Sequence, residues 1–171
     1  MIDLIRKTDI SILHFINSKL RCKLLDKIMP IITFFGSATF CAIFVVMTII
    51  SRNKDVKNLG VITSFSIIVS SGITHFIKRM KNRIRPYINI PGIIVNKIGV
   101  DDYSFPSGHT TAAFSIGMSI ALKFTGLATI SLILAALVGF SRIYLGVHYP
   151  TDVGAGVVVG SASAVFIKMI I

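Results

Sequence analysis

One stretch of this chain decides how the rest must fold: Ser141-Arg142-Ile143-Tyr144-Leu145-Gly146-Val147-His148-Tyr149-Pro150-Thr151-Asp152. It joins two apolar segments and brings Arg142, His148 and Asp152 close together in sequence. Ionisable side chains next to the hydrocarbon core of a membrane are costly and mark functional positions by default. We therefore interpret this stretch as part of a functional site between two membrane-spanning helices.

The whole chain is too apolar for a soluble protein. Of its 171 residues, 53% are hydrophobic, and the mean hydropathy is +0.80. Four uncharged intervals, each near the roughly 20 residues that cross a bilayer, cover residues 28–51, 58–77, 103–122 and 124–141. A fifth covers 153–171 if Lys168 snorkels to the interface. The sequence predicts an all-α, polytopic membrane helical bundle with about five spanning helices, forming a single domain over residues 1–171.

The N-terminal residues have a different character. Residues 1–20 combine an incomplete apolar stripe with Asp3, Arg6, Lys7 and Asp9. These charges are too many for a spanning segment, so we expect a helix that lies in the membrane interface.

The net charge of +11 indicates a negatively charged partner. Nucleic acid, anionic lipid head groups and an anionic substrate all fit this charge, but a membrane-embedded chain disfavours nucleic acid. All seven acidic residues are aspartates, and only Asp101, Asp102 and Asp152 lie near the reactive side chains in sequence. The sequence therefore offers too few nearby carboxylates to favour a di-metal site or an aspartyl phosphate.

A basic cluster follows the second apolar interval: Lys78-Arg79-Met80-Lys81-Asn82-Arg83-Ile84-Arg85-Pro86. Pro86 disfavours helical geometry at the residue before it, so we expect the helix to end at Arg85. Lys78 and Arg85 are then two helical turns apart on one face. The connection over 87–105 is interpreted either as a flap over the site or as an ordinary interfacial loop.

A third cluster, Pro106-Ser107-Gly108-His109, opens the third apolar interval. Ser107 suits an N-cap, and Gly108 allows close approach of the backbone. The unpaired N–H groups of a helix start can hold an anion.

Successive spans alternate in direction, so all three clusters are expected on one side of the membrane. Cations and backbone N–H groups suit a phosphate, whose transfer depends on positioning and charge neutralisation. One histidine can attack phosphorus while the other protonates the leaving oxygen, and Asp152 is well spaced to orient His148. A metal site is the alternative, but nearby fixed cations would repel a divalent ion.

The three clusters together resemble the signature of the type 2 phosphatidic acid phosphatase (PAP2) family, which belongs to the acid phosphatase and vanadium haloperoxidase superfamily. The matching residues are Lys78, Arg85 and Pro86, then Pro106-Ser107-Gly108-His109, then Ser141, Arg142, His148 and Asp152. The resemblance covers residues 78–152 by motif. It implies a membrane phosphatase that needs no metal ion or other cofactor.

The resemblance also implies a role for each matching residue. His148 would form a phosphohistidine, Asp152 would orient it, and His109 would be the general acid. The phosphate oxygens would be bound by Lys78, Arg85, Ser107, Gly108 and Arg142.

A site at the membrane surface favours a lipid phosphate as substrate, with membrane lipids as the other partners. Among the family's usual substrates we favour undecaprenyl diphosphate, with phosphatidylglycerophosphate and phosphatidic acid as alternatives. The rival from another class is a lipid-phosphate or anion transporter. Family resemblance predicts a plasma-membrane protein whose site faces outward, whereas the excess of Lys and Arg on the same side predicts an inward-facing site.

Overall fold

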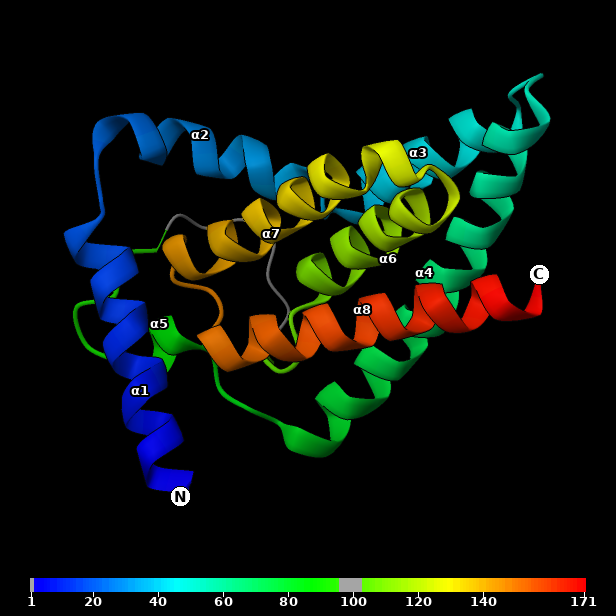
Figure 1. Ribbon diagram of the computed structural model, residues 1–171. Coiled ribbons are helices and arrows are strands. Elements are labelled where there is room, and N and C mark those ends of the chain that lie inside the picture. The colour runs from blue at the N-terminus through cyan, green and yellow to red at the C-terminus, as the bar shows by residue number, and fades with distance from the viewer. Residues whose placement is uncertain (1, 96–102) are drawn as a thin grey trace.

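The computed structural model describes residues 2–95 and 103–171, and every named element in this part of the chain is a helix (Figure 1). The elements are α1 (Ile2–His14), the π-helical turn η1 (Phe15–Lys19), α2 (Lys23–Phe34), α3 (Ala38–Ile49), α4 (Lys54–Lys81), α5 (Pro86–Asn89), α6 (Gly108–Lys123), the 3₁₀ turn η2 (Thr125–Leu127), α7 (Ala128–Tyr144) and α8 (Pro150–Ile170). The predicted all-α class is confirmed.

Several of these helices are candidates for crossing a membrane. Among the described residues, α4, η2 with α7, and α8 are each long and apolar enough. The pair α2 and α3 passes the same test together but is bent by 51°, so three or four spans satisfy it. Helix α6, expected as the third span, is about 24 Å long at 1.5 Å per residue and is shorter than α4, α7 and α8.

The first uncharged interval, residues 28–51, does not form one continuous helix, because the chain breaks between α2 and α3. Ser37 caps α3 by accepting a hydrogen bond from the Phe40 N–H at 3.2 Å, which stabilises a fresh helix start there. Gly36 allows the break to approach α6, since a Cβ atom at this position would lie 2.6 Å from the His109 carbonyl oxygen.

Helix α6 lies at the centre of the bundle and packs against α4, α7 and α8 (Figure 1). Small side chains bring these helices close together, as is common in membrane proteins. The Ser70 and Ser115 hydroxyl groups are 2.9 Å apart between α4 and α6. Gly156 and Gly160 of α8 lie directly against the α6 backbone, where a Cβ atom would meet the Ser107 and Thr111 carbonyl oxygens.

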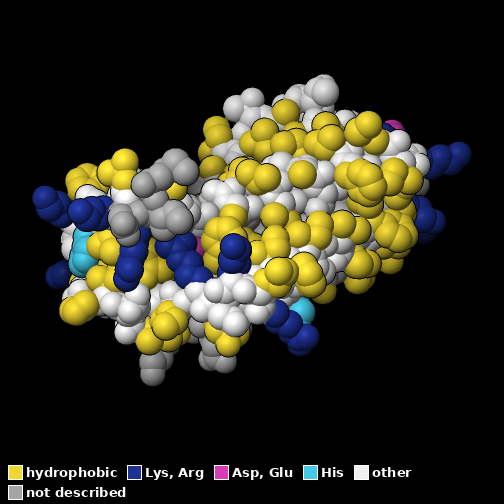
Figure 2. All heavy atoms as spheres, turned by 90° about the horizontal axis from the view of Figure 1, so that it is seen from below, with side chains coloured by type: hydrophobic (Ala, Val, Ile, Leu, Met, Phe, Trp, Pro, Cys, Tyr) yellow, Lys and Arg dark blue, Asp and Glu magenta, His cyan; other side chains and the backbone are white. Residues whose placement is uncertain are grey.

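The outer surface of the bundle is apolar. Exposed side chains on the long helices include Phe65, Ile68 and Phe76 on α4, Ile130 and Ile133 on α7, and Val158 and Phe166 on α8. Figure 2 shows hydrophobic side chains over most of the face it presents, with Lys and Arg gathered mainly towards the end that carries α1. Buried hydroxyl groups inside and apolar groups outside are the arrangement expected of a protein in a bilayer.

Helix α1 crosses the end of the bundle at which α7 stops and α8 starts (Figure 1). Leu13 is fully buried and packs in a cluster with Ile143 and Tyr149. The Asn17 side chain, in η1, donates to the Tyr144 carbonyl at 2.7 Å and accepts from the Ile94 N–H at 2.9 Å. The expected N-terminal helix is therefore present. It lies at one end of the bundle and packs directly against the residues at the end of α7.

Candidate active site

His148 is presented by the sharp end of α7. The Gly146 N–H donates to the Ile143 carbonyl at 2.9 Å, and the Val147 N–H donates to the Arg142 carbonyl at 3.2 Å. This pair of bonds is the Schellman pattern, which needs a left-handed residue, and Gly146 supplies it with φ of +73°. The turn reverses the chain immediately before His148, whose side chain is 2% exposed.

Asp152 is held at the start of α8. Pro150 occupies the first turn of this helix, and the Asp152 Oδ2 atom accepts the Tyr149 N–H at 2.9 Å. The Asp152 carbonyl accepts the Ser107 N–H at 3.0 Å, so the starts of α6 and α8 lie side by side. Ser107 caps α6 as predicted, accepting from the Thr110 N–H and hydroxyl groups.

Arg85 also lies beside His148, but the backbone that leads to it is not helical as expected. Helix α4 ends at Lys81, followed by Asn82 in the left-handed region at φ of 44°, and Arg85 is extended. The prediction that the helix continues to Arg85, with Lys78 and Arg85 on one helical face, is therefore wrong. The left-handed residue turns the chain, and Arg85 then donates to the Val147 carbonyl at 2.9 Å.

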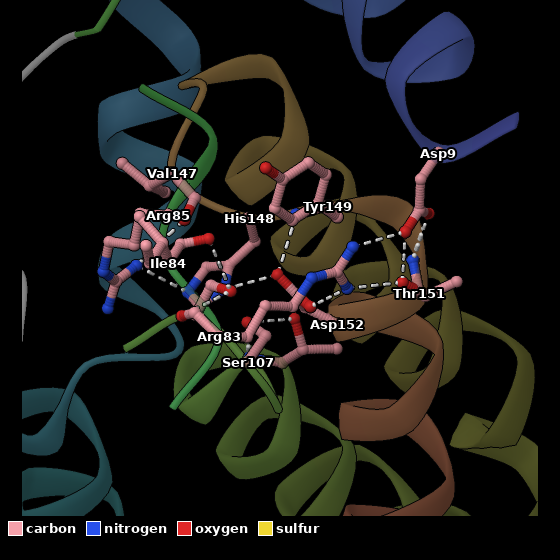
Figure 3. Close-up of polar contacts among 12 residues, drawn as sticks. Asp9, Arg83, Ile84, Arg85, Ser107, Val147, His148, Tyr149, Thr151 and Asp152 are labelled. Carbon is pink, nitrogen blue, oxygen red and sulfur yellow. Dashed lines mark hydrogen bonds and ion pairs between the residues drawn. The ribbon is translucent and has the colours of Figure 1, made fainter. Parts of the chain in front are cut away.

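The contact between His148 and Arg85 favours one tautomer of the imidazole. Its Nε2 atom lies 3.2 Å from Nη1 of Arg85. A guanidinium group can only donate, so Nε2 accepts and the ring proton resides on Nδ1. Nδ1 faces Oδ2 of Asp152 at 3.5 Å, which is a close approach but too long for a well-formed hydrogen bond. Figure 3 shows the imidazole between these two partners.

Three buried cations surround this ring: Lys78, Arg85 and Arg142 are 9%, 1% and 1% exposed. Burial first, and then the positive charges of Arg142, Arg85 and Lys78, hold the pKa of His148 well below its usual range. The imidazole is therefore neutral at pH 7, and Nε2 keeps the lone pair that a nucleophile needs. Arg142 is itself oriented by α2, because its Nη1 atom donates to the Thr33 hydroxyl at 2.8 Å.

The remaining two predicted residues, Gly108 and His109, lie at the first turn of α6. Both line a cavity of about 480 Å³ that is bounded by α3, α4 and α6. Gly108 also lines a smaller cavity of about 190 Å³ together with Lys78 and His75. All eight residues singled out in the sequence thus lie at one end of the bundle, around the meeting point of α4, α6, α7 and α8.

Two functional candidates were missed by the sequence analysis. Arg83 donates from Nη1 to Oδ1 of Asp152 at 2.6 Å and from Nη2 to Oδ2 of Asp9 at 2.8 Å. Asp9 is 2% exposed and also accepts the Thr151 N–H at 2.9 Å. Arg83 was one cation in a basic run, and Asp9 stood in an interfacial segment, so no local signal distinguished either one.

A comparison with protein families matches residues 59–171 to the PAP2 superfamily. This chain belongs to the PAP2 superfamily. The match covers all three motif clusters of this PAP2 chain and confirms the resemblance on which its predicted site rests.

Relatives of the PAP2 chain include two proteins with the name BcrC. The bacitracin transport permease protein BcrC of Bacillus licheniformis is 34% identical over 130 residues, which is 75% of this chain and 63% of that protein. The undecaprenyl-diphosphatase BcrC of Bacillus subtilis strain 168 is 28% identical over 137 residues, covering 79% of this chain and 69% of the relative. The chain thus spans less than two thirds of the length of the first relative. The two names describe a permease and a phosphatase. Transport and phosphate hydrolysis are also the two classes of function between which the sequence motifs leave a choice.

The fold of this PAP2 protein is also found in a solved structure. The crystal structure of LpxE from Aquifex aeolicus matches with a TM-score of 0.83 at 26% identity, covering 94% of both chains. The relatives and the apolar helices identify the PAP2 chain as a membrane protein.

Metal ligands are sparse around the PAP2 site. Within residues 2–95 and 103–171, no group of three or more His, Cys, Asp or Glu side chains could hold a metal ion. The predicted metal independence stays a prediction, supported by the three cations beside His148. Asp101, Asp102 and part of the proposed flap over 87–105 lie outside the described residues.

The low pKa of His148 predicts an unusual pH dependence. We expect kcat/KM to stay nearly constant from about pH 8 to about pH 6.5 and to fall only below that, where the imidazole becomes protonated. Arg85→Gln removes one positive charge that lowers the pKa, so the acid limb should move to higher pH. Rate profiles of both proteins with one soluble aryl phosphate measure this shift, and identical acid limbs would contradict it.

Proposed function

We propose that this protein is an integral membrane phosphatase that hydrolyses a lipid phosphate or diphosphate through a phosphohistidine at His148, without a metal ion or cofactor. One observation carries the proposal. The imidazole of His148 is buried and neutral, its Nε2 atom lies 3.2 Å from the Arg85 guanidinium, and the other ring nitrogen faces Asp152 at 3.5 Å. This is the arrangement needed for a nucleophile that attacks an anion held by cations.

The first step forms the enzyme intermediate. Lys78, Arg85 and Arg142 bind the phosphate oxygens together with Ser107 and the backbone at Gly108, at the N-terminus of α6. Nε2 attacks phosphorus, the bond from phosphorus to the leaving oxygen breaks, and His109 donates a proton to that oxygen. The imidazole becomes positively charged while keeping its Nδ1 proton, which Asp152 stabilises.

The second step regenerates the enzyme. His109, now neutral, accepts a proton from water as the water oxygen attacks the phosphohistidine. The bond from phosphorus to Nε2 breaks, inorganic phosphate leaves, and His148 returns to its neutral form. No electrons are exchanged and no other reactant is required.

The cavity beside His109 supports a lipid as the leaving group. Besides Gly108 and His109, it is lined mainly by small and apolar side chains of α3 and α4, such as Cys41, Val45 and Ile67. An apolar chain attached to the phosphate can occupy this cavity while the phosphate lies beside His148.

Undecaprenyl diphosphate is the substrate we favour, and phosphatidylglycerophosphate and phosphatidic acid are the alternatives. The similarity to the undecaprenyl-diphosphatase BcrC supports this choice. Purified protein should release phosphate from undecaprenyl diphosphate in detergent with EDTA present, at a higher kcat/KM than from the two glycerophospholipids. Faster release from either glycerophospholipid would make that lipid the preferred substrate instead. Phosphate release that requires added metal would contradict the mechanism.

His109 should matter most when the leaving group is poor. His109→Ala is expected to lower kcat by about 10²-fold or more for a lipid phosphate, because the leaving oxygen departs unprotonated. An activated aryl phosphate needs no such proton, so its rate should be nearly unchanged. Equal losses with both substrates would exclude general acid catalysis as the role of His109.

A transporter that binds lipid phosphate without cleaving it remains the second candidate, and the permease name of one relative favours it. Transport without hydrolysis predicts movement of an intact lipid phosphate across proteoliposomes and no release of inorganic phosphate. Phosphate release by the wild-type protein in EDTA would exclude a purely transporting function.

We further propose that the protein lies in the plasma membrane with its site facing outward. Cys22 is exposed and its backbone contacts Tyr144 at the site end of the bundle, whereas Cys41 is buried. A membrane-impermeant maleimide should therefore label intact cells at Cys22, and Cys22→Ser should abolish the labelling. Labelling only after the cells are permeabilised would place the site inside.

A further inference from the structure

Arg83 forms a bridge between two buried carboxylates that come from opposite ends of the sequence. Its Nη1 atom lies 2.6 Å from Asp152 and 2.7 Å from the Thr151 hydroxyl, and its Nη2 atom lies 2.8 Å from Asp9. The guanidinium carbon lies 3.9 Å from the centre of the Tyr149 ring. Figure 3 shows Arg83 reaching between Asp9 and Asp152. The side chain is thus fixed by ionic contacts and by stacking.

Asp9 is an unusual residue for an interfacial helix. It is 2% exposed, and both of its oxygens are used: Oδ1 accepts the Thr151 N–H, and Oδ2 accepts from Arg83 and the Thr151 hydroxyl. Burying a carboxylate is costly, and replacing a whole buried ion pair with apolar side chains is often neutral for stability. The presence of an acid here therefore points to a task beyond anchoring α1.

The task follows from what Arg83 does to Asp152. Oδ1 of Asp152 is held by Arg83, and Oδ2 is held by the Tyr149 N–H at 2.9 Å while facing Nδ1 of His148. With both oxygens restrained, the carboxylate cannot rotate away from the imidazole. Partners that orient a functional ligand in this way commonly change activity by about 10- to 100-fold when they are removed.

We propose that Arg83 and Asp9 are positioning residues: Asp9 on α1 holds Arg83, and Arg83 holds Asp152 in the orientation that aligns His148. The N-terminal helix is then part of the working site. This inference rests on the proposed function, in which Asp152 orients the nucleophile. Neither residue touches the substrate, and both act through Asp152.

The test compares Arg83→Gln in two backgrounds, wild type and Asp152→Asn. In the wild-type background we expect kcat to fall about 10- to 100-fold with KM nearly unchanged. In the Asp152→Asn background the same change should lower kcat less than about threefold, because the group through which Arg83 acts is already altered. Inhibition by inorganic phosphate should be unchanged, since Arg83 does not bind the phosphate.

Each contrary outcome has a distinct meaning. Equal losses in the two backgrounds would make Arg83 a purely structural residue, and a raised KM with weaker phosphate inhibition would make it a substrate ligand. Full activity of Arg83→Gln, with Asp152→Asn impaired, would overturn the inference alone. Full activity of Asp152→Asn would instead overturn the role that the proposed function gives to Asp152.

Asp9→Asn provides a second variant that keeps the bond between Arg83 and Asp152. It should lower kcat by a smaller factor than Arg83→Gln, again without raising KM, and the double variant should be no slower than Arg83→Gln alone. Additive losses would contradict a single chain of contacts. Asp55→Asn is the matched control, because Asp55 is 66% exposed and pairs only with Lys123 at the other end of α4 in the described contacts.

Discussion

Replacing His148 with alanine is expected to abolish phosphate release, with kcat lower by at least about 10³-fold, because no other group replaces an attacking nucleophile. The imidazole is buried among Lys78, Arg85 and Arg142, and these cations remain in the variant to bind phosphate. The loss should therefore appear in kcat and leave inhibition by inorganic phosphate nearly unchanged. Release of phosphate from a lipid phosphate in detergent with EDTA measures the effect.

A matched control separates this loss from a general effect of removing a histidine. His14 is half-buried at the end of α1 and is not one of the proposed site residues, so His14→Ala should retain wild-type activity. Rapid acid-free quenching with a labelled substrate should trap a phosphorylated wild-type protein and no phosphorylated His148→Ala protein. Normal turnover by His148→Ala would remove the nucleophile from the mechanism and leave the transporter as the better explanation.

Asp152→Asn should produce the second-largest loss, a fall in kcat of about 10² to 10⁴-fold. An amide can still accept the Tyr149 N–H that starts α8, so the fold should be kept. It carries no charge, however, and cannot stabilise the imidazolium that forms when His148 attacks. It can also turn its NH₂ group towards the ring, which favours the wrong tautomer.

Asp152→Asn should therefore lower kcat strongly while leaving thermal stability nearly unchanged. The melting temperature is expected to change little beside the change in kcat, because Arg83 keeps its contact with Asp9. Asp55→Asn again serves as the control for loss of an aspartate charge. A normal kcat in Asp152→Asn would contradict an orienting role. Loss of the folded state in this variant would also contradict it, because the loss of activity would then come from unfolding.

Local rules predicted those features that depend on a few neighbouring residues. Ser107 was recognised as an N-cap because a hydroxyl just before an apolar run satisfies N–H groups two or three positions further on. The end of α4 was misplaced, since Pro86 was treated as the stop signal while Asn82, in a left-handed conformation, ends the helix four residues earlier. The break between α2 and α3 was also missed, because Gly36 is required by its approach to α6 and not by its neighbours in sequence.

The amino-acid sequence by itself determined that this is an apolar helical membrane protein of the PAP2 type, and it predicted His148, His109, Asp152 and their cations as the site. These features are encoded in short motifs and in the lengths of uncharged segments. Only the tertiary structure decided that Asp9 of α1 contacts Arg83 and that Arg83 in turn contacts Asp152. Those contacts join residues 74 and 69 positions apart, so they depend on how the helices pack, and helix packing leaves no mark on the sequence next to either residue.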